Sequence, residues 1–132
     1  MYVKPENWKP SDGLTLEPNA LKVVTESKDN YLVVAGPGAG KTELLAQRAG
    51  FLLQTNSCLF PKKILAISFK RDAAKNLNDR VEKRCEKHLA VRFNSVTFDT
   101  FAKGILDRFI HGLPERYKPI TYEVLLDYRD VE

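Results

Sequence analysis

The sequence has few of the residues that would indicate a disulfide scaffold, a metal site or a membrane segment. Its 132 residues include two cysteines, two histidines, and seven each of glycine and proline. Cys58 and Cys85 form no Cys-x-x-Cys pair, so neither a zinc site nor a disulfide framework is expected. No apolar run approaches the roughly 18 residues of a transmembrane helix, and the N-terminus has no apolar signal core. These absences predict a cytoplasmic protein without a membrane partner.

Charge is ordinary in amount and uneven in position. The chain is 29% charged with a formal net charge of +4. Between Pro61 and Arg92, ten Lys or Arg stand against four acids, so this basic segment carries +6 and the remainder carries −2. Such a concentration favours a polyanionic partner, and a solvated helix face is the alternative interpretation.

Apolar spacing along the chain predicts strands that alternate with helices. Short apolar runs predict three strands, over residues 31–35, 63–69 and 94–98. Apolar positions at helical intervals predict helices over residues 18–27, 41–54 and 99–111. A long helix is expected after the second strand, with the stripe Ala73, Leu77, Val81 and Cys85. This alternation predicts an α/β fold, a parallel sheet with helices on both faces.

The most informative motif lies between the first expected strand and its helix. It reads Ala35-Gly36-Pro37-Gly38-Ala39-Gly40-Lys41-Thr42, a phosphate-binding loop in which a small residue replaces the first glycine. The glycines allow several backbone N–H groups to point into one concavity, at a helix N-terminus that favours anions. Lys41 is then expected to reach the β- and γ-phosphates of ATP, and the Thr42 hydroxyl to bind Mg²⁺. The expected nucleotide contacts are Gly36, Pro37, Gly38, Ala39, Gly40, Lys41, Thr42 and Glu43, of which Lys41 and Thr42 are the catalytic candidates.

Three segments occur in an order that resembles a known family. They are Tyr31–Thr42, Ile64–Ala74 and Val96–Ala102, which resemble motifs I, Ia and Ib of UvrD/Rep-type superfamily 1 DNA helicases. The resemblance spans roughly residues 14–110 and implies a partial RecA-like motor domain that binds ATP and Mg²⁺. It also implies that motifs Ia and Ib line a single-stranded DNA track, through Ser68, Phe69, Lys70, Arg71, Thr97 and Phe98. The adenine-reading glutamine of the family falls near Asn19.

Two physical arguments support a DNA track at these motifs. Lys70 and Arg71 lie at a helix start, where the helix dipole disfavours cations and a bound phosphate would relieve the conflict. Phe69 and Phe98 follow the carboxyl ends of expected parallel strands, where an exposed ring could stack on a base. The alternative is that both phenylalanines are core residues.

The resemblance divides the chain into three parts. Residues 1–13 are an irregular lead-in, residues 14–112 the partial motor domain, and residues 113–132 the start of an inserted subdomain or a tail. Within that tail, residues 122–126 fit either a strand or a helical turn.

No Asp-Glu pair follows that could hold Mg²⁺ and orient water, because Asp127 is followed by Tyr128. The chain is therefore expected to be a helicase fragment or truncated product, which needs the second motor domain and hydrolyses ATP slowly or not at all. Two alternatives stay open: a small phosphotransferase of the nucleotide-kinase type, and a non-catalytic module that binds nucleotide or nucleic acid.

Overall fold

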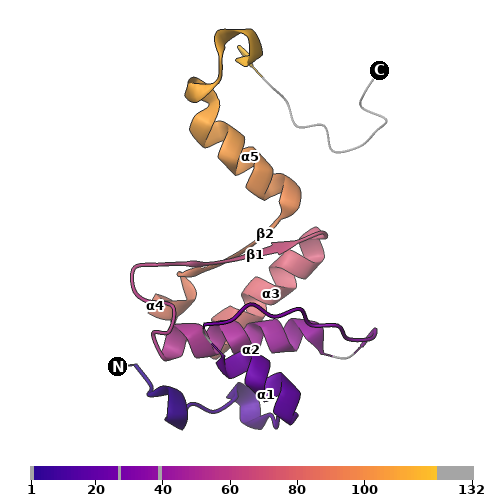
Figure 1. Ribbon diagram of the computed structural model, residues 1–132, viewed down its shortest axis with the longest axis vertical. Coiled ribbons are helices and arrows are strands. Elements are labelled where there is room, and N and C mark those ends of the chain that lie inside the picture. Colours follow the sequence, from indigo (N-terminus) through magenta and orange to yellow (C-terminus); the bar gives the residue numbers. More distant parts are fainter. Residues whose placement is uncertain (1, 27, 39, 122–132) are drawn as a thin grey trace. The chain divides into compact units, whose positions relative to one another are not determined.

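A computed structural model describes residues 2–26, 28–38 and 40–121 (Figure 1). The chain divides into two compact units, Met1–Phe98 and Asp99–Glu132. The first unit contains, in chain order, η1 (Pro5–Asn7), η2 (Ser11–Gly13), α1 (Pro18–Thr25), α2 (Lys41–Gln54), β1 (Ile64–Ser68), α3 (Arg71–Arg84), α4 (Lys87–Ala90) and β2 (Phe93–Thr97). Helix α5 (Phe98–Phe109) begins at the junction, and η3 (Ile110–Gly112) and η4 (Glu115–Tyr117) follow it.

Strands β1 and β2 form a parallel pair, which confirms the α/β class and the parallel pairing predicted from the sequence. Ile64 is opposite Phe93 at one end of the pair, and Ser68 is opposite Thr97 at the other. Helix α3 connects the strands and packs on both of them. The Asn78 side chain of α3 also bonds the backbone N–H and carbonyl of Ser95, at 2.9 and 3.0 Å. The helix is thereby fixed to the sheet by hydrogen bonds as well as by apolar contact.

Helix α2 lies between two apolar clusters. One cluster joins α2 to α3, α4 and the sheet, and its buried members are Ala46, Ala49, Leu53, Leu77, Val81, Cys85, Leu89 and Ala90. The other joins α2 to α1 and the lead-in, with Trp8, Val24 and Phe51 at its centre. The rings of Trp8 and Phe51 meet edge to face, with centroids 5.4 Å apart. The described residues of this lead-in contain the short helices η1 and η2, and Trp8 between them packs on α2.

The predicted strand over residues 31–35 is wrong. This segment is extended but pairs with no described strand, and Leu32 and Val34 are 90% and 88% exposed. A strand needs hydrogen-bonding neighbours, and the described sheet consists only of β1 and β2. The apolar composition of the segment therefore did not determine its pairing.

The sheet differs from the prediction in a second respect. Leu65 and Ile67 of β1 alternate with the half-buried residues of that strand and are each nearly half exposed. Helix α3 packs on the sheet, and no described element of the first unit buries these two side chains. Helices on both faces are therefore not observed in the described first unit.

Outside this unit, the helix predicted over residues 99–111 is present as α5 followed by η3, and no residue of α5 is buried. The strand or turn expected at residues 122–126, and Asp127 and Tyr128, lie outside the described residues.

Candidate functional site

The glycine-rich loop precedes α2 and has the backbone conformation that its glycines permit. Gly38 and Gly40 have φ angles of 76° and 70°, in the left-handed region that glycine adopts without strain. A β-carbon built on either residue would meet no atom within 4 Å. The loop therefore depends on glycine for its bend and leaves open space in front of its backbone. Ala39, between the two glycines, lies outside the described residues.

Lys41 closes this loop upon itself. Its Nζ donates hydrogen bonds of 2.8 and 2.7 Å to the carbonyl oxygens of Ala35 and Gly36. An ammonium group carries three donors, and both of these bonds are exposed to solvent. Because Gly40 caps α2 at its N-terminus, the charge of Lys41 and the positive end of the helix dipole lie at the same loop. The arrangement is electropositive and accessible.

The other expected nucleotide contacts differ in their surroundings. The side chain of the half-buried Thr42 makes no hydrogen bond within the described part of the chain, so its hydroxyl is available to a ligand. Asn19 is exposed on the first turn of α1, and no hydrogen bond joins it to a described loop residue. The Glu43 carboxylate is bonded to the neighbouring helix α3: its Oε2 accepts from Arg80 at 2.7 Å and from Arg84 at 2.9 Å.

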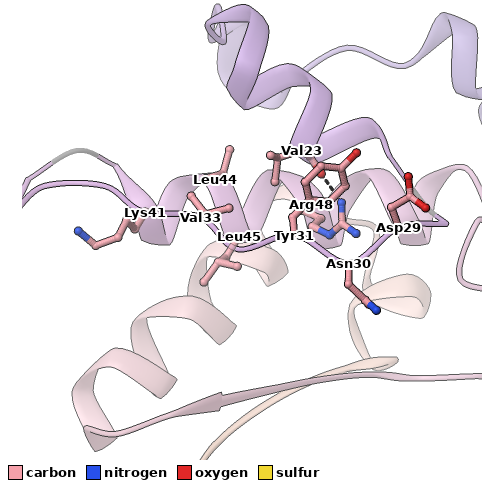
Figure 2. Close-up of a pocket in the computed structure, with 9 residues that line it drawn as sticks. All are labelled: Val23, Asp29, Asn30, Tyr31, Val33, Lys41, Leu44, Leu45 and Arg48. Carbon is pink, nitrogen blue, oxygen red and sulfur yellow. Dashed lines mark hydrogen bonds between the residues drawn. The ribbon is translucent and has the colours of Figure 1, made fainter.

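A pocket that sequence reasoning did not find lies along α2, between α1 and the extended segment (Figure 2). Its volume is about 380 Å³, and its lining residues are Val23, Asp29, Asn30, Tyr31, Val33, Lys41, Leu44, Leu45 and Arg48. Lys41 lies at one end, with its ammonium directed away from the Tyr31 ring. Arg48 donates to the carbonyls of Val23 and Glu26 and lies 6.0 Å from that ring's centroid. The guanidinium of this pocket is therefore already bonded to the protein.

The expected DNA contacts meet at one end of the sheet. The pairing of Ser68 with Thr97 places Phe69 and Phe98 at the same edge, one residue beyond the last strand pair. Phe69 is 94% exposed and Phe98 is 61% exposed, so the core interpretation of these two rings is wrong. Thr97, by contrast, is buried.

Next to Phe69, the N-cap residue Lys70 and the first helical residue Arg71 are exposed at the start of α3. The Lys70 side chain makes no cap hydrogen bond. The structure therefore brings an aromatic ring and two cations together at one surface.

The basic segment is divided between interior and surface. Arg92 is 4% exposed and donates to the carbonyls of Lys62 and Cys58, while Arg80 and Arg84 bond to Glu43. The seven other cations of the segment are exposed: Lys62, Lys63, Lys70, Arg71, Lys75, Lys83 and Lys87. The surface charge available to a polyanion is therefore smaller than the sequence count indicates.

Comparison with known proteins decides the family. The profile of the UvrD/REP helicase N-terminal domain matches residues 16–127. The chain belongs to this family. A probable DNA helicase II homolog from Rickettsia felis is 34% identical over 113 residues, which are 83% of this chain and 17% of that relative. DNA helicase IV of Escherichia coli is 38% identical over 69 residues, 52% of this chain and 10% of the relative. The ATP-dependent DNA helicase PcrA of Leuconostoc citreum is 33% identical over 87 residues, 66% of this chain and 12% of the relative.

This UvrD/REP helicase N-terminal domain thus covers about a sixth of the Rickettsia relative's length and less of the other two. Among the described residues, no helix is long and apolar enough to cross a membrane. In the same residues, no group of three or more His, Cys, Asp or Glu is placed to hold a metal ion.

Proposed function

We propose that this chain is the ATP-binding N-terminal segment of a UvrD-like 3′–5′ DNA helicase, with a partial RecA-like fold. The observation that carries the proposal is the Lys41 ammonium bonded across a loop in which Gly38 and Gly40 have left-handed backbone angles. Such a loop offers backbone N–H groups, a helix N-terminus and one accessible cation to a polyphosphate. Membership of the family supports the same assignment.

The residues at the loop fit ATP and Mg²⁺. Open space lies in front of Gly36, Gly38 and Gly40, where a side chain would otherwise exclude the phosphates. Lys41 would exchange its two carbonyl partners for β- and γ-phosphate oxygens, and Thr42 would ligate the metal. When bound, the Mg²⁺ neutralises phosphate charge.

Single-stranded DNA is the proposed partner at the edge formed by Phe69, Lys70, Arg71 and Phe98. Exposed rings can stack on successive bases whatever the sequence, which suits an enzyme that moves along a strand. The adjacent cations would contact backbone phosphates and make the binding dependent on salt. The exposure of both rings and both cations supports this assignment.

Turnover is proposed to require more than these residues. Phosphoryl transfer needs carboxylates that orient water and cations that stabilise the transferred group. We assign these roles to the remainder of a full-length helicase, including its second motor domain. The chain alone is therefore proposed to bind nucleotide with little hydrolysis.

The test is ATP turnover by this chain with and without single-stranded DNA, with Lys41→Ala as the control. Retained nucleotide binding without turnover is the expected result. Robust turnover that is abolished in Lys41→Ala would locate a complete active site in this chain and contradict the fragment interpretation. Turnover with a nucleoside monophosphate acceptor and no DNA binding would favour the phosphotransferase alternative instead.

A further inference from the structure

Glu43 occupies the first turn of α2, directly after the loop residues Lys41 and Thr42. Its side chain is only 20% exposed, and both carboxylate oxygens accept hydrogen bonds from the protein. Oε2 accepts from Arg80 and Arg84 of α3, and Oε1 accepts from Gln47 at 2.9 Å. These hydrogen bonds hold the carboxylate toward α3, and its negative charge would be repelled by a triphosphate.

The partners of Glu43 are themselves fixed in place. Arg84 is 9% exposed at its side chain, and its Nη1 donates a hydrogen bond of 3.0 Å to the carbonyl of Arg80 one turn earlier. Its Nη2 also lies 3.2 Å from Asp12 in the lead-in. Gln47 is fully buried and accepts from the Ser11 N–H at 3.0 Å. Glu43 therefore joins α2 to α3, and its partners Arg84 and Gln47 extend the network to the lead-in.

This network joins the two helices that carry the proposed binding surfaces, and its arginines lie in the C-terminal half of α3. Glu43 lies two residues after the lysine proposed to bind phosphate, and α3 begins with the cations proposed to bind DNA. Charge-assisted bonds between partly buried groups are stronger and more directional than apolar contacts. A shift of the first turn of α2 would therefore be passed to α3 through Arg80 and Arg84.

We propose that Glu43 is a positioning residue that joins the phosphate loop to helix α3, so that nucleotide binding and DNA binding influence each other through its ion pairs. The inference rests on the proposed function, because it requires both ligands. It assigns Glu43 a role through α3 in place of the direct nucleotide contact expected from its position in the sequence. Coupling between two sites is reciprocal, so either ligand can report it.

The experiment measures the affinity of this chain for a fluorescent oligo(dT) with and without saturating Mg²⁺ and a non-hydrolysable ATP analogue. The wild type is expected to show an affinity change of at least about fivefold on adding nucleotide, the lower end of common coupling factors. Glu43→Gln is expected to reduce that change below about twofold, while nucleotide affinity without DNA stays within about twofold of wild type. Glu82→Gln is the matched control, since Glu82 is an exposed acid on α3 with no described partner, and should retain the full change.

A second pair of variants tests whether Glu43→Gln acts by impairing folding, because it leaves the buried Arg84 with only the exposed Asp12 carboxylate as an ion-pair partner. The Arg80 side chain is 40% exposed, so Arg80→Met should fold and weaken the coupling, since only the Arg84 ion pair remains, and Arg80→Lys should recover part of the loss. An equal reduction of nucleotide affinity with and without DNA in Glu43→Gln would make Glu43 a nucleotide contact and overturn the inference. So would a wild type that binds both ligands independently. A wild type that binds neither ligand would instead contradict the proposed function.

Discussion

The ammonium of Lys41 lies 2.7 Å from the carbonyl oxygen of Gly36, five residues earlier in the same loop. With the second bond to Ala35, this contact makes the lysine an internal closure of the loop. A phosphate that enters the loop would compete for the same ammonium. The lysine therefore supports the loop, and its proposed second role is to attract the ligand.

Replacement of Lys41 by alanine should weaken nucleotide binding by about 30- to 150-fold. This range corresponds to the removal of roughly 2–3 kcal/mol, as for a hydrogen bond to a charged group. Titration of a fluorescent ATP analogue with Mg²⁺ measures it. Lys83→Ala is the control, because Lys83 is an exposed lysine on α3. Unchanged nucleotide affinity in Lys41→Ala would contradict the assignment of a phosphate site to this loop.

Charge reversal of Lys70 and Arg71 to glutamate should weaken binding to oligo(dT) and make it less dependent on salt. The slope of log affinity against log salt is negative, and its magnitude decreases by about 0.7 for every single-strand phosphate that the protein no longer neutralises. Fluorescence anisotropy at several salt concentrations provides both quantities. Lys83→Glu with Lys87→Glu changes the net charge equally at exposed positions beyond the start of α3. If both pairs lower the slope alike, the DNA attraction is a property of the net charge.

Phe69→Ala should weaken oligo(dT) binding by about 5- to 150-fold, as expected when roughly 1–3 kcal/mol of stacking on one base is removed. Because a ring that is 94% exposed contributes little to the core, thermal stability should stay close to wild type. The control is Phe109→Ala, another exposed phenylalanine, on α5. Reduced stability with unchanged DNA affinity would assign Phe69 a structural role.

The stability of the chain should fall as the pH rises from 9 toward 11. Burial raises the pKa of the Cys85 thiol from 9.0 to about 11, and the nearby Arg84 charge opposes part of the shift. The folded state keeps the proton longer than the unfolded state, so stabilisation is complete below pH 9 and is lost as the pH approaches 11. A pKa rise of this size corresponds to a loss of about 2–3 kcal/mol in the free energy of unfolding. Denaturant unfolding of wild type and Cys85→Ala at each pH measures it, and an equal decline in both would assign the effect to other groups.

Local patterns in the sequence predicted most of the elements. Helix α2 matches the predicted residues 41–54, and α1, α3, β1 and β2 are within a few residues of their predictions. Their apolar spacing and the glycine-rich turn act over a few residues, so the sequence alone is sufficient for them. The exception is the apolar run over residues 31–35, because a strand forms only where another strand supplies hydrogen-bonding partners.

The candidate site likewise has features that the sequence predicts and features that only the structure shows. The spacing of the loop residues was enough to predict the glycine bend before α2, and the order of the three motif segments was enough to predict the family. The bonds of Lys41 to the carbonyls of Ala35 and Gly36 were not predicted. The partners of Glu43 were not predictable, because Arg80 and Arg84 lie 37 and 41 residues away and carry the same charge as seven exposed neighbours. Packing of α3 on α2 is what turns two of these cations inward. Short-range patterns thus specify the local elements and the glycine-rich loop. Three-dimensional packing sets which charges are bonded inside and which remain at the surface, because burial depends on contacts between distant residues.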